Sequence, residues 1–303
     1  MSVATSSRFL ELRVLAALEH MRFTTRHQLN GAFSGRHAAR QHGGSGEFVD
    51  YREYSAGEDL RKLDWKVLSR TGRAYVRLYQ DETNLRCLLA LDTSGSMRFG
   101  ARSEHVSAGS KLEYAQYLAT ALSHIISHGQ DQVGLALLAG SLREYLPPAG
   151  TQTHVRRLHE LIEQARTSAS LTLAASLQEL FARAQKRGVL LVMSDFLVDD
   201  LEETFAALRL FRHRQWEVIT LHLVHPDETR LPEGTAYQFD GLENDGAVRC
   251  SPSECRELYE ELFARHVAMV RTLALSCGCD YRRLSTGVSY LQALGGFLIE
   301  RSG

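Results

Sequence analysis

From residue 85 onward, short apolar runs alternate with amphipathic patterns of helical period. The apolar runs are continuous, which is typical of strands buried on both faces of a sheet. They predict strands at 85–91, 132–138, 188–193, 217–224 and 280–284, with 142–146 as a hairpin partner of the second. The helical patterns predict helices at about 111–128, 153–166, 173–187, 200–213, 252–276 and 288–301. We therefore expect an α/β fold with a doubly wound, mostly parallel sheet between two layers of helices.

The first 84 residues follow a different pattern. Apolar residues recur at helical spacing over 8–22, which predicts an amphipathic helix in an arginine-rich arm. The Gly-Gly-Ser-Gly run at 43–46 predicts a flexible break, and the alternation over 73–79 predicts a strand. We therefore divide the chain into an N-terminal arm with a small accessory segment, 1–84, and an α/β domain, 85–303.

Aromatic and charged residues are concentrated in the accessory segment between 47 and 84. The most distinctive of them are Tyr51, Arg52, Tyr54, Asp59, Arg61, Asp64, Trp65 and Arg70. One interpretation is a partly buried network of ion pairs and aromatic stacks that braces the fold, because buried charges need partners. The other is a docking surface for a partner. We prefer the bracing network, which predicts that Trp65 is buried.

Composition and charge exclude several classes of protein. Of the 303 residues 44% are hydrophobic, which excludes disorder as the main state. The charges of the 35 basic and 36 acidic residues nearly cancel, so the chain has no overall positive field that would attract nucleic acid. Nucleic-acid binding through the arginines of the arm is a minor alternative. We find no apolar run of membrane-spanning length and no signal peptide, and therefore expect a cytoplasmic protein with free cysteines.

Two of the predicted strands end in oxygen-bearing side chains. Asp92, Ser94 and Ser96 follow the strand at 85–91, and Asp195 follows the strand at 188–193. Because ligands of open α/β sheets bind at the carboxyl ends of strands, we expect these residues to lie together. A site of carboxylate and hydroxyl oxygens suits Mg²⁺ or Mn²⁺, with water completing the coordination. The alternative is an ordinary turn, in which Asp and Ser are common.

The spacing Asp92-x-Ser94-x-Ser96 resembles the signature of von Willebrand factor A-type domains, which carry a metal-ion-dependent adhesion site on a doubly wound sheet. The stretch from Glu47 to Arg70 is similar to the signature of a bacterial family, domain of unknown function family fifty-eight, whose members carry such a domain behind it. This resemblance covers about residues 8–301 and implies that Asp195 is the distal aspartate of the metal site. It also implies a MoxR-type AAA+ ATPase as partner, because family members are typically encoded beside one.

One position departs from the family pattern. The family usually supplies a threonine ligand in a G-T-x-L-x-x-x-L context, and alignment on Leu173 and Leu177 puts Leu171 at that place. Thr172 is one residue late and Ser170 one residue early. Either could serve after a local shift, or the ligand could be absent. We include Thr172 in the candidate metal site.

Catalytic signatures are missing from the sequence. It contains no phosphate-binding P-loop, no G-x-S-x-G elbow, no H-E-x-x-H and no G-x-G-x-x-G after the first α/β strand. The first hypothesis is therefore a non-enzymatic, metal-dependent protein-binding module, an adaptor or co-chaperone, whose Mg²⁺ accepts a carboxylate from a partner. The alternative is a Mg²⁺-dependent hydrolase or phosphatase. That chemistry usually needs a second carboxylate two residues after the first, where this chain has Ser94.

Overall fold

The structure is a computed structural model of the 303-residue chain. It describes residues 9, 12–18, 20–25, 40–41, 47–55, 63–80, 85–100, 109–170, 172–184, 187–234, 236–243 and 246–302. The chain divides into two compact units, one of residues 1–26 and 86–303 and the other of residues 27–85. The sequence prediction has a single boundary, after residue 84. The structure has a boundary one residue later and a second one after residue 26.

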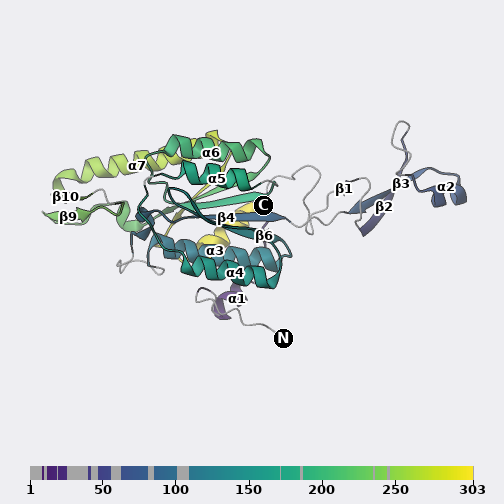
Figure 1. The fold of residues 1–303 in the computed structure, drawn as a ribbon, viewed down its shortest axis with the longest axis horizontal. Coiled ribbons are helices and arrows are strands. Elements are labelled where there is room, and N and C mark those ends of the chain that lie inside the picture. Colours follow the sequence, from purple (N-terminus) through teal and green to yellow (C-terminus); the bar gives the residue numbers. More distant parts are fainter. Residues whose placement is uncertain are drawn as a thin grey trace. The chain divides into compact units, whose positions relative to one another are not determined.

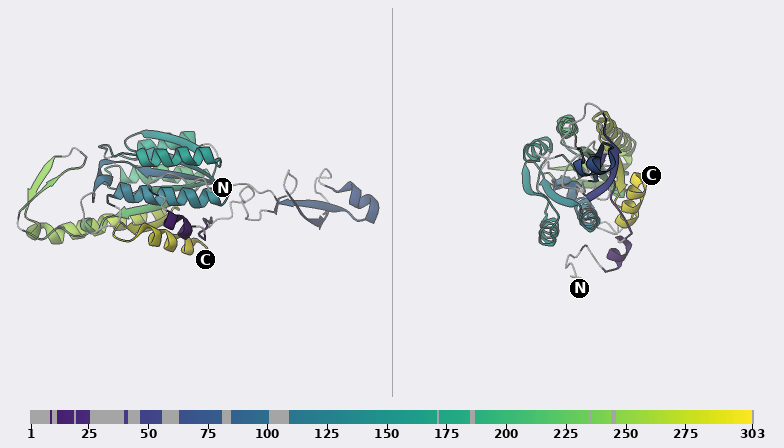
Figure 2. Two further views of the ribbon diagram at one scale, coloured as in Figure 1. Left: turned by 90° about the horizontal axis from the view of Figure 1, so that it is seen from below. Right: turned by 90° about the vertical axis from the view of Figure 1, so that its right-hand side faces the viewer.

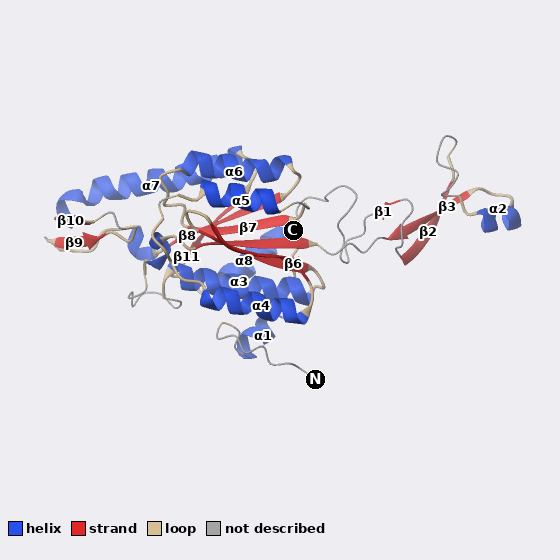
Figure 3. Ribbon diagram, viewed as in Figure 1, coloured by secondary structure: helices blue, strands red, loops and turns tan. Residues whose placement is uncertain are grey.

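The larger unit is built on a six-stranded sheet with the strand order β11-β8-β7-β4-β5-β6 (Figure 3). Its strands are β4 (Arg86–Asp92), β5 (Gln132–Leu138), β6 (Leu142–Ala149), β7 (Val189–Ser194), β8 (Glu217–Val224) and β11 (Asp280–Ser285). All neighbours pair in parallel except β6, which runs antiparallel to β5 at the edge. The prediction of a mostly parallel sheet is confirmed.

Helices cover both faces of this sheet (Figures 1 and 2). One layer contains α3 (Lys111–His128), which packs against α4 (Gln152–Gln164), α8 (Tyr290–Ser302) and α1 (Leu12–Leu18). The other contains α5 (Ala174–Arg183), α6 (Leu201–His213) and α7 (Pro252–Ser276). Because both faces are covered, every residue of β7 and β8 is buried, which explains their continuous apolar sequences. None of the described helices is both long and apolar enough to cross a bilayer.

Two described residues of the N-terminal arm, Phe9 and Thr24, are attached to this unit by burial and hydrogen bonds. Phe9 is buried and packs edge-to-face on Tyr117, with the ring centroids 4.7 Å apart. Thr24 Oγ1 donates to the carbonyl oxygen of Arg301, whose Nε donates back to the carbonyl oxygen of Thr24 at 2.9 Å. The Arg301 guanidinium also pairs with the buried carboxylate of Glu217. These contacts explain why residues up to 26 belong with the α/β unit.

In its described residues, the smaller unit contains a three-stranded antiparallel sheet and one short helix. Its elements are β1 (Arg40–Gln41), β2 (Glu47–Glu53), α2 (Trp65–Thr71) and β3 (Tyr75–Gln80), with the strand order β1-β3-β2. Asp64 is the N-cap of α2, because its carboxylate accepts from the backbone N–H groups of Lys66 and Val67 at 2.9 and 3.2 Å. The helix ends at Gly72, whose φ of 69° is a left-handed conformation that glycine adopts without strain.

The expectation that Trp65 is buried is wrong. Its side chain is 59% exposed at the start of α2, whereas Leu63 and Val76, which form a β-bridge with each other, are buried. Arg70 is exposed and Tyr54 is half-buried. Tyr51 and Arg52 pair through their backbones with Arg77 and Val76 of β3. Asp59 and Arg61 lie outside the described residues, so the predicted network is described only in part.

Candidate functional site

The candidate site lies where the strand order of the large sheet reverses. From β4 the chain proceeds to β5 on one side, and β7 lies on the other side. The carboxyl ends of two such strands form the crevice in which open α/β sheets bind ligands. Leu91 pairs with Met193 in parallel register, so Asp92 at the end of β4 lies beside Ser194 and Asp195 at the end of β7. The sequence prediction that these two strand ends meet is confirmed.

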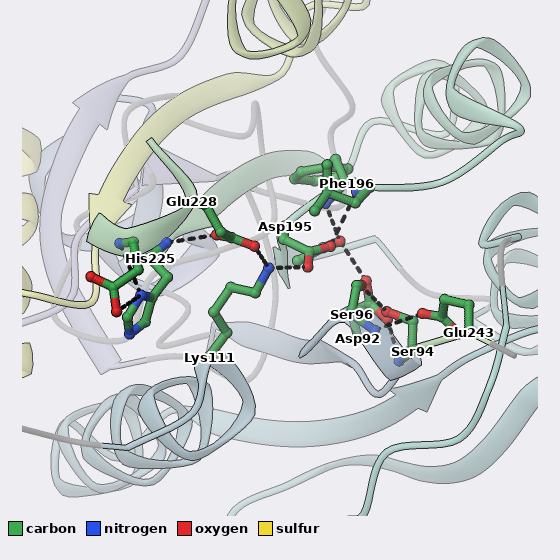
Figure 4. Close-up of polar contacts among 12 residues, drawn as sticks. Asp92, Ser94, Ser96, Lys111, Asp195, Phe196, His225, Glu228 and Glu243 are labelled. Atoms are coloured by element: carbon green, nitrogen blue, oxygen red, sulfur yellow. Dashed lines mark hydrogen bonds and ion pairs between the residues drawn. The ribbon is translucent and has the colours of Figure 1, made fainter. Parts of the chain in front are cut away.

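The turn after β4 places three oxygen-bearing side chains together (Figure 4). Asp92 Oδ1 accepts from the backbone N–H of Ser94 at 2.8 Å, and Ser94 is followed by the 3-10 helix η2 (Gly95–Arg98). The hydroxyl oxygens of Ser94 and Ser96 lie 3.1 Å apart. In an octahedral Mg²⁺ site with oxygens at about 2.0–2.1 Å, neighbouring ligands lie about 2.9 Å apart. The two hydroxyls therefore have a spacing that suits adjacent positions on one ion.

Ser194 completes the surroundings of Asp92. Its hydroxyl donates to Asp92 Oδ2 at 2.5 Å and accepts from the backbone N–H of Phe196 at 2.8 Å. Both carboxylate oxygens of Asp92 are thus oriented by hydrogen bonds, and the side chain is fully buried. Burial, together with repulsion from the carboxylate of Asp195, raises the pKa of Asp92 to about 7. A cation at this place would favour the ionised carboxylate, because an opposite charge offsets both effects.

Asp195 belongs to a second, buried charge network (Figure 4). Lys111, the first residue of α3, is fully buried, and its Nζ donates to Asp195 Oδ2 at 2.6 Å and to a carboxylate oxygen of Glu228. Glu228 ends the 3-10 helix η3 (Pro226–Glu228) and accepts from the backbone N–H of His225 at 2.8 Å. The other oxygen of Asp195 accepts from the backbone N–H of Leu197 at 3.1 Å. Asp195 therefore joins the serine turn to a buried lysine.

The charges of this network oppose the effect of burial on the pKa of each of its groups. Burial disfavours the carboxylate of Asp195, but Lys111, together with the hydrogen bonds from Leu197 and Ser96, keeps the pKa of Asp195 below its ordinary value. Burial also disfavours the ammonium of Lys111, but the two carboxylates beside it raise its pKa. At Glu228 burial prevails and raises the pKa, although Lys111 opposes this effect. Asp195 also accepts a hydrogen bond from the hydroxyl of Ser96, and this bond connects the Lys111 network to the Asp92 turn.

Thr172 does not join this arrangement. It is exposed, and its backbone N–H donates to the hydroxyl of Ser170 at 3.4 Å. Asp200 accepts from the backbone N–H groups of Leu173 and Ala174 at the start of α5. Among the hydrogen bonds of the described residues, none joins Thr172 to the Asp92 turn. Leu171, the position that aligns with the family's threonine, lies outside the described residues.

Another carboxylate approaches the turn from a distant part of the chain. Glu243 Oε1 accepts from the backbone N–H of Ser96 at 2.6 Å, and its other oxygen accepts from the backbone N–H of Ser170. The backbone of Ser168 also lies here, since Ser168 bridges to Ser94 in parallel. The turn after β4 and the loop between α4 and α5 therefore each present an N–H group to one carboxylate.

Sequence reasoning missed Ser194, Lys111, Glu228 and Glu243. The register of β4 against β7 predicts the position of Ser194, because it places Asp92 opposite this residue. Lys111 carried a weaker signal: helices in doubly wound folds begin at the carboxyl ends of strands, so the first residue of a helix lies near the site. We find no sequence signal for Glu228 or Glu243.

The donor set suits a hard cation only with water as additional ligand. Within the described ranges, no three His, Cys, Asp or Glu side chains are grouped as they would be to hold a metal ion. The site instead offers the carboxylate of Asp92 and the hydroxyls of Ser94 and Ser96, with Asp195 behind Ser96. Mg²⁺ commonly binds through one or two carboxylates and several waters, so these residues fit that ion. His222 is also buried, and its Nδ1 lies 2.9 Å from the hydroxyl of Tyr281 on the neighbouring strand β11.

Known proteins resemble most of the chain in sequence or in structure. The uncharacterized protein Rv1480 of Mycobacterium tuberculosis is 26% identical over 295 residues, which cover 95% of this chain and 90% of that protein. Among solved structures, the conserved hypothetical protein BatB from Bacteroides thetaiotaomicron is 18% identical, with a TM-score of 0.48 over 72% of this chain and 99% of that one. An aerotolerance-related membrane protein from Bacteroides fragilis is 19% identical, with a TM-score of 0.46 over 72% of this chain and 100% of that one.

The family profile described as "Protein of unknown function DUF58" matches residues 50–269. The match includes most of the described smaller unit, both strand ends of the candidate site, and the hairpin that carries Glu243. It agrees with the resemblance of the segment 47–70 to this family. Because the match extends over well over half of the sequence, the chain belongs to the DUF58 family.

Proposed function

We propose that this chain is a metal-dependent protein-binding module of von Willebrand factor A type, which recognises a carboxylate of a partner protein. The observation that supports this function best is the joining of Asp92, Ser94 and Ser96 to Asp195 at the switch point of the sheet. Asp92, Ser94 and Ser96 would hold Mg²⁺ or Mn²⁺. When bound, the ion would supply a positive charge with exchangeable waters for an incoming carboxylate.

The hydrogen bonds of the two aspartates favour binding over hydrolysis. The carboxylate of Asp92 is oriented by Ser94 and Ser194, and that of Asp195 by Lys111 and Leu197. A nucleophile or general base needs an oxygen within reach of the substrate and access to it. Both side chains are at most 2% exposed, and both of their carboxylate oxygens already accept hydrogen bonds. The two aspartates are therefore better suited to stabilising a bound cation than to attacking a substrate.

The proposed partner is a MoxR-type AAA+ ATPase, for which this chain would act as adaptor or co-chaperone. This part of the proposal depends on the resemblance of the two sequence signatures and on no contact in the structure. The single carboxylate contact is modest, so the loops around the site would have to add area and specificity.

A binding experiment with the full chain tests the proposal. The tagged chain should retain a MoxR-type ATPase of the same genome in Mg²⁺ and lose it in EDTA. Ser96→Ala should abolish retention, whereas Ser253→Ala, a control at an exposed serine at the start of α7, should not. Retention that is unaffected by EDTA and by Ser96→Ala would contradict a metal-dependent module. Turnover of p-nitrophenyl phosphate that is lost in Asp92→Asn would instead support a Mg²⁺-dependent phosphatase.

A further inference from the structure

The carboxylate of Glu243 comes from a hairpin that the sheet does not require. The strands β9 (Tyr237–Asp240) and β10 (Ala247–Cys250) pair antiparallel with each other in a sheet of their own. This β9–β10 hairpin lies between η3 and α7 in the sequence, at the end of the unit from which α7 projects (Figures 1 and 2). Its described side chains are largely exposed, with Val248 at 64% and Tyr237 at 40%.

The tip of this hairpin lies on the candidate metal-binding turn. Glu243 accepts hydrogen bonds from the backbone N–H groups of Ser96 and Ser170 (Figure 4). The close approach depends on Gly95: a Cβ at this position would lie 2.7 Å from Oε2 of Glu243 and closer still to the carbonyl oxygen of Leu242. The absence of a side chain at Gly95 thus leaves room for a carboxylate and its backbone directly above the serine turn.

The position of Glu243 has the chemistry expected of a partner's carboxylate. Hydrogen bonds from N–H groups to an ionised carboxylate are among the stronger ones in proteins. Here two N–H groups from two loops converge on one carboxylate, next to the hydroxyls of Ser94 and Ser96. A carboxylate from another protein that reached these hydroxyls would meet the same N–H groups. Glu243 and the partner would therefore compete for one place.

We propose that the β9–β10 hairpin masks the site in cis, with Glu243 standing in the place of the partner's carboxylate, so that a partner binds only when the hairpin is released. This inference rests on the proposed function for the identity of the ligand. The inference assigns a regulatory role to Glu243 and makes the backbone N–H groups of Ser96 and Ser170 the donors that hold its carboxylate.

The hairpin is suited to release. A two-stranded hairpin without further strands has little stability of its own. Segments with few buried apolar contacts open at far lower free energy than the core. The exposed strands of this hairpin contrast with the fully buried β7 and β8 beneath the site, so the hairpin can leave while the sheet stays intact.

A peptide supplied in trans tests the masking. The probe is a labelled peptide with the sequence of residues 237–249, YQFDGLENDGAVR, and its binding is followed by fluorescence anisotropy in Mg²⁺ and in EDTA. We expect the full-length Glu243→Gln chain to bind it at least about tenfold more tightly than the parent, because a site open about one-tenth of the time has about one-tenth of its intrinsic affinity. A peptide with glutamine in place of Glu243 should bind neither protein.

Hydrogen exchange provides a second measurement on the same proteins. The amides of β9 and β10 should exchange faster in Glu243→Gln than in the parent, while those of β7 and β8 stay protected. Glu233→Gln is the matched control, because Glu233 is an exposed glutamate shortly before the same hairpin. It should change neither exchange nor peptide affinity.

The outcomes separate the two proposals. Tighter peptide binding by Glu243→Gln in Mg²⁺ but not in EDTA supports masking of a metal site. Tighter binding in both solutions supports masking and contradicts the proposal that the carboxylate binds through a metal ion. Equal affinity of Glu243→Gln and the parent, or unchanged exchange of the hairpin, overturns the masking, whatever the metal measurements give.

Discussion

Replacement of Lys111 by methionine tests whether its ammonium group holds the site together. Lys111 is fully buried and donates to Asp195 at 2.6 Å and to Glu228. Methionine keeps an apolar stem of similar length but leaves two buried carboxylates without their counter-ion. Removing one partner of a buried ion pair costs about 3–5 kcal/mol, and we expect the free energy of unfolding to fall by this amount in EDTA at pH 7. The additional change Glu228→Gln should recover part of the loss, because it removes one of the uncompensated charges.

Urea unfolding followed by the fluorescence of the buried Trp216 measures this loss. Arg157→Met is the matched control, because Arg157 pairs with Glu160 at 3.3 Å on the surface and both side chains are about half exposed. An exposed pair contributes at most about 1 kcal/mol. The reasoning is refuted if Lys111→Met costs no more than this control.

Three further predictions concern stability. Trp65→Ala should change the free energy of unfolding by no more than about 0.5 kcal/mol, because Trp65 is exposed, whereas Trp216→Ala in the core should cost about 3–5 kcal/mol, both measured by urea titration followed by far-UV circular dichroism. Asp64→Ala should cost about 1 kcal/mol through loss of the N-cap of α2, and an unchanged urea midpoint would contradict the cap. Burial lowers the pKa of His159 from 6.5 to about 4, so the unfolded chain takes up this proton first and stability should fall as the pH drops from 6.5 to 4. His159→Gln should make the urea midpoint less dependent on pH in this range, and an identical pH profile would contradict the assignment.

The strands and helices of the α/β unit were predictable because burial on both faces leaves a strong pattern. The strand β8 was predicted at its observed bounds, 217–224, and every residue in it is buried. The helix α7 was predictable from Pro252, which suits the first position of a helix. The hairpin β9–β10 was not predicted, because its strands have four residues each and lack a buried face.

Only those residues of the site that directly follow a predicted strand could be predicted from the sequence. Asp92, Ser94 and Ser96 share one turn, and the strand periodicity places Asp195 at the neighbouring strand end. Glu243 is 147 residues from Ser96 in the sequence, in a polar turn like many others, so its role follows only from the tertiary fold. Trp65 shows the opposite error: an aromatic residue in a distinctive motif suggested a core position, but the capping geometry of Asp64 makes it the exposed first residue of a helix.

Calorimetric titration of the parent chain and of Asp92→Asn with Mn²⁺ tests the central claim most directly. Asp199→Asn, at an exposed aspartate in the loop after β7, is the control, and circular dichroism verifies that all three proteins are folded. Loss of a residue behind the ligands typically weakens metal binding by about 10–100-fold, so loss of the Asp92 charge should weaken it at least as much. We predict one Mn²⁺ per chain in the parent and in Asp199→Asn, and binding weakened to this extent in Asp92→Asn. Equal affinity in all three proteins, or no binding by the folded parent, would contradict the metal site.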